Sequence, residues 1–116
     1  MTRSRAAAAI VAVLVAGTAV AQDIDKPFAH SVRPRGVAEE CFKLPAGQSI
    51  GYAFESSAPV DFNIHFHRGN DVAYPVKADG ARSASDRFTA PSGEEYCLMW
   101  TNRTLEMVTV KGRLAP

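Results

Sequence analysis

Two histidines separated by one residue, His65-Phe66-His67, form the part of the sequence best suited to chemistry. In an extended strand the side chains of residues i and i+2 leave the same face, about 6.5–7 Å apart. Imidazole nitrogens at that spacing can share a copper or zinc ion when a neighbouring strand supplies a third ligand. Four other residues are candidates for that ligand: His30, Asp61, Met99 and Met107. The alternative is a pair of solvent-facing histidines on a polar sheet face, because two ligands alone make no metal site.

The other reactive side chains do not suggest a catalytic arrangement. Glu39-Glu40 and Glu94-Glu95 are adjacent pairs. Neighbouring side chains of a strand point to opposite faces, so neither pair suits acid–base catalysis. Ser92 stands in Pro-Ser-Gly, without the G-x-S-x-G context of a nucleophile elbow, and is expected to be a turn residue. We therefore predict no catalytic residue, no enzymatic activity, and no cofactor other than copper or zinc at the histidine pair.

The N-terminus has the layout of an export signal. Two arginines in the first five residues precede 16 small or apolar residues, 6–21, which is fewer than the roughly 20 that span a bilayer. Ala19-Val20-Ala21 before Gln22 has the A-x-A form of a signal-peptidase site. We predict a signal peptide over 1–21 and a periplasmic or secreted mature protein without a transmembrane segment. An uncleaved anchor helix is the alternative.

The numbers of basic and acidic residues do not indicate a nucleic-acid partner. The 116-residue chain, long enough for one domain, carries 13 Lys and Arg against 12 Asp and Glu. Removal of the leader with its two arginines leaves 11 basic against 12 acidic side chains, without a basic cluster. Nucleic acids are bound through such clusters, so we expect no nucleic-acid partner.

The chain has two cysteines, Cys41 and Cys97. An even pair in a small exported domain is typical of a structural disulfide. Closing a loop of that length stabilises by about 4 kcal/mol in the chain-entropy model. The alternatives are a redox pair or metal-binding thiols, but the sequence has neither C-x-x-C nor a zinc-type Cys–His spacing.

Hydrophobic residues alternate with polar ones from Val37 onward, which is typical of half-buried strands. Phe62, Ile64 and Phe66 share one strand face, so we expect them to point into the core. Their partners there are expected to be Tyr52, Phe54, Leu98 and Trp100. His65 and His67 then share the opposite face, where we expect both to be exposed to solvent.

About seven short strands separated by turn residues predict an all-β fold, an antiparallel β-sandwich. The expected strands are 37–44, 48–55, 60–67, 72–76, 83–89, 94–101 and 105–113. The segment 22–36 is polar, contains two prolines and lacks a period, so we expect it to be irregular. The predicted β-sandwich domain therefore covers 37–116.

Several stretches of the chain, in this order, resemble the GOLD (Golgi dynamics) domain, the lumenal β-sandwich of cargo receptors of the early secretory pathway. The stretches are Glu40-Cys41-Phe42, Leu44-Pro45-Ala46-Gly47, the strand with Tyr52 and Phe54, Val60-Asp61-Phe62-Asn63-Ile64, Val72-Ala73-Tyr74-Pro75, Ser83-Ala84-Ser85, Phe88-Thr89-Ala90-Pro91 and Glu95-Tyr96-Cys97-Leu98-Met99-Trp100-Thr101-Asn102. Cys41 and Cys97 fall where many of these receptors carry a disulfide. The coiled coil, membrane helix and sorting tail of the receptors are missing, so cargo reception does not carry over. The resemblance implies a binding or assembly module without catalytic residues.

Two functional hypotheses follow from these observations. The first is a non-catalytic, exported β-sandwich that binds a protein partner or assembles through its sheet. The second is a small periplasmic metal-binding protein that uses His65 and His67 for copper or zinc.

Overall fold

The computed structural model describes residues 7–12 and 23–116 of the chain. These residues form six β-strands: β1 Lys26–Val32, β2 Val37–Leu44, β3 Ser49–Arg68, β4 Asp71–Thr89, β5 Glu94–Thr101 and β6 Val108–Ala115. Most of the predicted signal peptide and its cleavage site after Ala21 lie outside the described residues. In the described ranges, no helix is long and apolar enough to cross a membrane.

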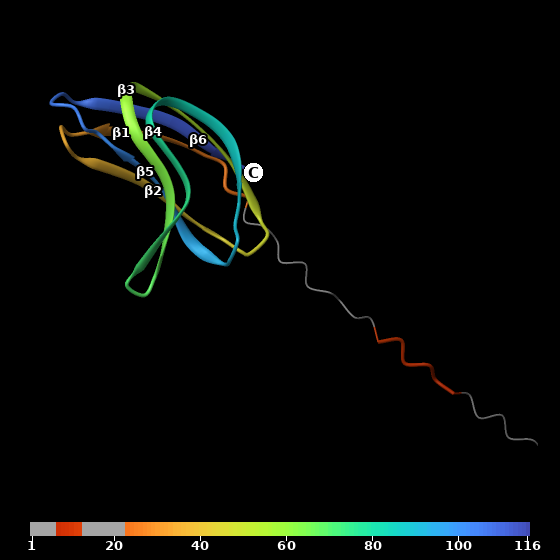
Figure 1. The fold of residues 1–116 in the computed structure, drawn as a ribbon. Coiled ribbons are helices and arrows are strands. Elements are labelled where there is room, and N and C mark those ends of the chain that lie inside the picture. The colour runs from red at the N-terminus through yellow and green to blue at the C-terminus, as the bar shows by residue number, and fades with distance from the viewer. Residues whose placement is uncertain (1–6, 13–22) are drawn as a thin grey trace, which may run out of the picture.

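All six strands belong to one antiparallel sheet with the order β1-β6-β3-β5-β2, and β4 pairs with β3 (Figure 1). The long strand β3 organises this sheet because its partners change along its length. Residues 51–56 of β3 pair with β6, whereas residues 61–65 pair with β5. The sheet therefore curls over on itself and encloses a core between its two halves, as in a β-sandwich. The predicted all-β antiparallel fold class is confirmed.

The structure has fewer and longer strands than the sequence predicted. The expected strands 48–55 and 60–67 are one strand, β3, and 72–76 and 83–89 are one strand, β4. The turn-forming residues between them lie in irregular stretches of the ladder, with register shifts between Glu55 and Val60. Pro59 falls in this gap, where it has no ladder hydrogen bond to lose. The turn-forming residues within β3 and β4 therefore lie at a bulge and a bend, and not between separate strands.

The expectation that 22–36 is irregular is wrong for the stretch that forms β1. This strand pairs with β6 from Lys26 opposite Leu114 to Val32 opposite Val108. Its Phe28 and Val32 side chains are buried in the core. Pro27 is tolerated because β1 is an edge strand with one ladder partner. The domain therefore begins before residue 37.

The core consists of the side chains on the inner face of the curled sheet. Phe62, Ile64 and Phe66 are buried there as predicted, and so are Tyr52, Phe54, Leu98 and Trp100. The Trp100 ring lies at its centre, with ring centroids 5.1 Å from Phe28 and 5.6 Å from Phe54. Aromatic pairs at such distances add to the stabilisation from buried area.

Candidate functional site

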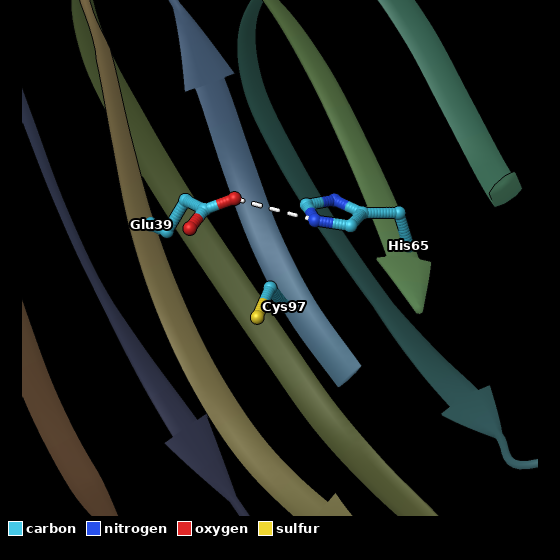
Figure 2. A group of neighbouring side chains, drawn as sticks. All are labelled: Glu39, His65 and Cys97. Atoms are coloured by element: carbon cyan, nitrogen blue, oxygen red, sulfur yellow. Dashed lines mark ion pairs between the residues drawn. The ribbon is translucent and has the colours of Figure 1, made fainter. Parts of the chain in front are cut away.

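Several side chains that could bind a ligand lie together on the outer face of β2, β5 and β3. Strand register places Cys41, Cys97 and His65 in one row across the three strands. The next row contains Glu39, Met99 and Asn63. Residues directly opposite one another in antiparallel strands share a face, so both rows project to the same side. Figure 2 shows the Glu39 carboxylate and the His65 imidazole pointing toward each other, with Cys97 beside them.

His65 is at the centre of this group. Its Nδ1 lies 2.8 Å from Asn63 Oδ1, and its Nε2 lies 3.2 Å from Glu39 Oε1. The His67 ring is perpendicular to it with centroids 5.3 Å apart, and the Tyr74 ring from β4 is 5.9 Å away. Only 3% of His65 is exposed, although its strand face was predicted to face solvent. That prediction is wrong for His65 because neighbouring side chains on three strands cover it, whereas His67 is exposed as expected.

Burial controls the protonation of His65. Loss of solvent lowers the pKa of the imidazole from 6.5, and the Glu39 carboxylate opposes this by raising the pKa. The nearby His67 lowers the pKa further. The neutral ring donates from Nδ1 to Asn63 Oδ1, so Nε2 carries a lone pair that faces the Glu39 carboxylate. Two lone pairs at this distance repel each other unless a proton or a metal ion lies between them.

The disulfide predicted between Cys41 and Cys97 is confirmed and lies beside this histidine. The two cysteines are directly opposite each other on β2 and β5, with Cα atoms 4.0 Å apart. Cys97 is buried, whereas Cys41 is exposed. Sulfur in a disulfide is a poor metal ligand, since it is the thiolate that coordinates. With the disulfide intact, His65 and Glu39 are the only strong donors among the three clustered residues.

The structure separates most of the third ligands proposed for the histidine pair. Met99 lies in the row next to His65, on the same face. His30 Nε2 forms a hydrogen bond with Glu40 Oε1. The Asp61 carboxylate accepts hydrogen bonds from Arg103 and from the Gly80 amide. Met107 is exposed in the loop before β6. Metal binding by His65 and His67 themselves therefore stays a prediction.

A second organised feature is the turn between β4 and β5, which contains Ser92. The Tyr96 hydroxyl donates to the Ser92 carbonyl at 2.5 Å and accepts from the Ser92 amide at 3.4 Å. Arg68, at the end of β3, donates to Ser92 Oγ at 3.2 Å and to Glu94 Oε1 at 2.9 Å. Ser92 is thus a turn residue, as predicted. We call residues 91–94 together with Arg68 the Ser92 turn.

A buried amide organises the opposite end of the domain. Asn102 is fully buried, and its side-chain nitrogen donates to the carbonyls of Val32, Arg33 and Glu106. Its side-chain oxygen accepts from the Thr104 amide at 2.9 Å. These hydrogen bonds fix the loop 102–107 to the β1–β2 turn. In this loop, Leu105 is 74% exposed to solvent. Sequence reasoning missed this role, because nothing local marks an asparagine whose partners are 69 and 70 residues away.

Comparisons with known proteins identify the fold of this chain but not its family. No protein-family model matches the chain, and a comparison with curated proteins finds no match. Among solved structures, the chain is similar to PliG of Aeromonas hydrophila, a periplasmic inhibitor of g-type lysozyme. That match has a TM-score of 0.64 and 16% identity, and it covers 81% of this chain and 87% of PliG.

Two further structures share this fold. The Yersinia pseudotuberculosis-derived mitogen has a TM-score of 0.60 and 10% identity, over 80% of this chain and 86% of the mitogen. The pre-peptidase C-terminal domain of Bacillus anthracis collagenase has a TM-score of 0.60 and 10% identity, over 78% and 89% of the two chains. None of these structures is named as a GOLD domain, so that resemblance stays a prediction.

Proposed function

We propose that this chain is an exported, non-catalytic β-domain that binds a protein partner, and that the partner is a lysozyme. The proposal is supported by the shared fold with PliG, whose name describes a periplasmic inhibitor of g-type lysozyme. The predicted export signal and the disulfide favour the same compartment. Titratable side chains that the fold brings together near the core, such as His30 with Glu40, form a structural pair.

The observation that carries the proposal is the rigid Ser92 turn. Both backbone polar groups of Ser92 are bonded to the Tyr96 hydroxyl, and Tyr96 is itself fully buried. Such a turn loses little conformational entropy on binding, so more of its contact energy contributes to affinity. The Arg68 side chain beside it is 68% exposed and keeps further N–H donors free for a partner.

The chemistry of this turn suits a glycosidase cleft. Glycoside hydrolases generally place a pair of carboxyl groups on either side of the bond that they cleave. A narrow turn can enter a concave cleft, and the exposed Arg68 guanidinium is a hydrogen-bond donor for carboxylates. Charged and polar groups placed in this way give specificity to the interface.

The test is a direct binding and inhibition assay on the disulfide-bonded protein. We expect it to bind a g-type lysozyme and to slow the clearing of a peptidoglycan suspension, with a c-type lysozyme as comparison. If neither enzyme binds at tens of micromolar protein, the lysozyme assignment is overturned.

Substitutions locate the binding surface. Arg68→Ala should weaken lysozyme binding about tenfold or more, as for an arginine near the centre of an interface. The matched control is Arg82→Ala, which removes an exposed arginine from β4. A third variant, Leu105→Ser, tests the loop 102–107 at the other end of the domain. Loss of binding in Leu105→Ser but not in Arg68→Ala would move the interface away from the Ser92 turn.

A further inference from the structure

The outer face of β2, β5 and β3 holds four potential zinc donors, and two of them are joined in the Cys41–Cys97 disulfide. One ligand atom from each of Glu39, His65 and Cys97 lies within 4.8 Å of the other two. Cys41 Sγ is covalently bonded to Cys97 Sγ, so a fourth donor is one bond away. Carboxylate oxygen, imidazole nitrogen and two thiolate sulfurs are all ligands that Zn(II) accepts in tetrahedral sites.

The distance between His65 and Glu39 matches that between two ligands of one tetrahedral ion. Bonds of about 2.0–2.1 Å at a tetrahedral angle place a nitrogen and an oxygen donor about 3.3–3.4 Å apart. The observed separation of His65 Nε2 and Glu39 Oε1 is 3.2 Å. The two donors are therefore already placed as a shared ion requires.

The hydrogen bond on the far side of the imidazole fits the same arrangement. His65 Nδ1 faces Asn63 Oδ1, which can only accept, so the proton resides on Nδ1 and Nε2 is free to coordinate. Metal-binding histidines generally donate from their second nitrogen to a fixed acceptor in this way. The neutral ring and the carboxylate turn lone pairs toward each other, and a cation between them would remove that repulsion.

We infer that reduction of the Cys41–Cys97 disulfide opens a Zn(II) site whose ligands are Cys41, Cys97, His65 and Glu39. The reductant is a dithiol: its two sulfurs form a disulfide, the protein disulfide is cleaved, and two protons pass to Cys41 and Cys97. Zn(II) then displaces those two thiol protons, which are released to solvent. Two sulfurs that both bind one zinc ion at about 2.3 Å lie about 3.8 Å apart, so the thiolates need only a small separation after cleavage.

The cluster is accessible to both reagents. Cys41 is exposed on the edge strand β2, which among the described strands pairs with β5 alone, so a reductant can reach its sulfur. The Glu39 side chain is 42% exposed and gives an ion a path from solvent to the buried His65. This site differs from the His65–His67 pair considered from the sequence, because the exposed His67 is not among its ligands.

Metal titration of the full mature protein tests the inference. The protein is prepared with the disulfide intact and, separately, reduced with a phosphine, which does not compete for metal. The phosphine takes the oxygen of a water molecule to become its oxide, and the two protons of that water pass to Cys41 and Cys97. Zn(II) should bind the reduced protein at least about 100-fold more tightly than the oxidised one. Co(II), used as a spectroscopic probe, should give thiolate charge-transfer absorption and tetrahedral d–d bands in the reduced protein only. Equal Zn(II) affinity in the two forms would overturn the inference.

Two glutamate variants separate this site from thiols that simply bind zinc. Glu39→Gln should weaken Zn(II) binding to the reduced protein about tenfold or more, since it replaces a charged ligand. The matched control is Glu95→Gln on the neighbouring strand, which should leave the affinity unchanged, as should His67→Ala. Both glutamate positions are solvent-exposed, so these variants are expected to fold.

Circular dichroism shows whether the reduced chain is still folded. Zn(II) should restore or preserve the β-sheet signal of the reduced protein, because an ion that binds the native state stabilises it. If zinc binds reduced Glu39→Gln as tightly as reduced wild type, or binds without the native sheet signal, the four-ligand site does not exist.

Discussion

The carboxylate of Glu40 accepts a hydrogen bond from the imidazole of His30, with Oε1 and Nε2 2.9 Å apart. These residues lie on β2 and β1, the two ends of the strand order, which the curl of the sheet brings together. Lys26 adds an ion pair to the same carboxylate at 3.0 Å. Side chains thus join the two edges of the sheet where the strand pairing stops. Glu39 points the other way, toward His65, as expected for adjacent residues of a strand.

Glu40→Ala should destabilise the domain by about 1–3 kcal/mol, because it leaves His30 and Lys26 without their partner at the margin of the core. Chemical denaturation of the variant and wild type measures the loss. Glu95→Ala is the control, since that side chain is exposed and its removal should cost less than about 0.5 kcal/mol. Similar losses at the two positions would show that the Glu40 contacts do not stabilise the fold.

Asn102→Ala should cost about 3 kcal/mol, because it removes the donor to the buried Val32 carbonyl and to the partly buried Arg33 and Glu106 carbonyls at the junction of two loops. The exposed Asn70, in the turn between β3 and β4, provides the matched control Asn70→Ala. Hydrogen exchange should show faster exchange of the 102–107 backbone in the Asn102 variant. Retained protection of that loop would contradict the role given to this amide.

Removal of the disulfide by the double substitution Cys41→Ser and Cys97→Ser should lower the free energy of unfolding by about 4 kcal/mol. The physical reason is the larger conformational freedom of the unfolded chain when 56 residues are no longer closed into a loop. Denaturant titration at neutral pH measures the change. A loss below about 1 kcal/mol would mean that the neighbouring strand contacts alone hold β2 in place.

The buried His65 should make stability depend on pH. Its pKa in the folded protein lies below 6.5, chiefly because burial disfavours the charged ring. Below about pH 6.5 the unfolded chain binds a proton that the folded chain does not, so the free energy of unfolding falls as the pH is lowered. Above that pH both states are unprotonated at this residue and the stabilisation is fully present.

Denaturation of wild type and His65→Gln between about pH 7.5 and pH 5 tests this dependence. The loss of stability toward acid should be smaller in His65→Gln than in wild type. His67→Gln is the control, because this exposed ring is expected to leave the slope unchanged. A wild-type slope in His65→Gln would assign the acid sensitivity to other groups.

The amino-acid sequence by itself determined the fold class, the inner face of the sheet and the disulfide. The alternation of Phe62, Ile64 and Phe66 with polar residues places them in the core wherever the strand pairs, since side chains alternate along any strand. The only two cysteines of a domain predicted to be exported have one possible partner each, so their pairing needs no knowledge of the fold. These properties depend on local periodicity and on counting, which a single sequence contains.

Tertiary structure alone decided the surroundings of His65, the role of Asn102 and the continuity of β3. The alternation of hydrophobic and polar residues gives the strand face on which His65 lies. Whether His65 is exposed to solvent on that face depends on Glu39 and Tyr74, which come from other strands. Asn102 resembles any loop asparagine until β1 supplies its carbonyl partners. Ser56 to Pro59 has the composition of a turn and forms a bulge because the strand partners on either side keep the chain extended. Each of these outcomes depends on contacts between residues distant in sequence, and local patterns carry no information about which distant strand will lie alongside.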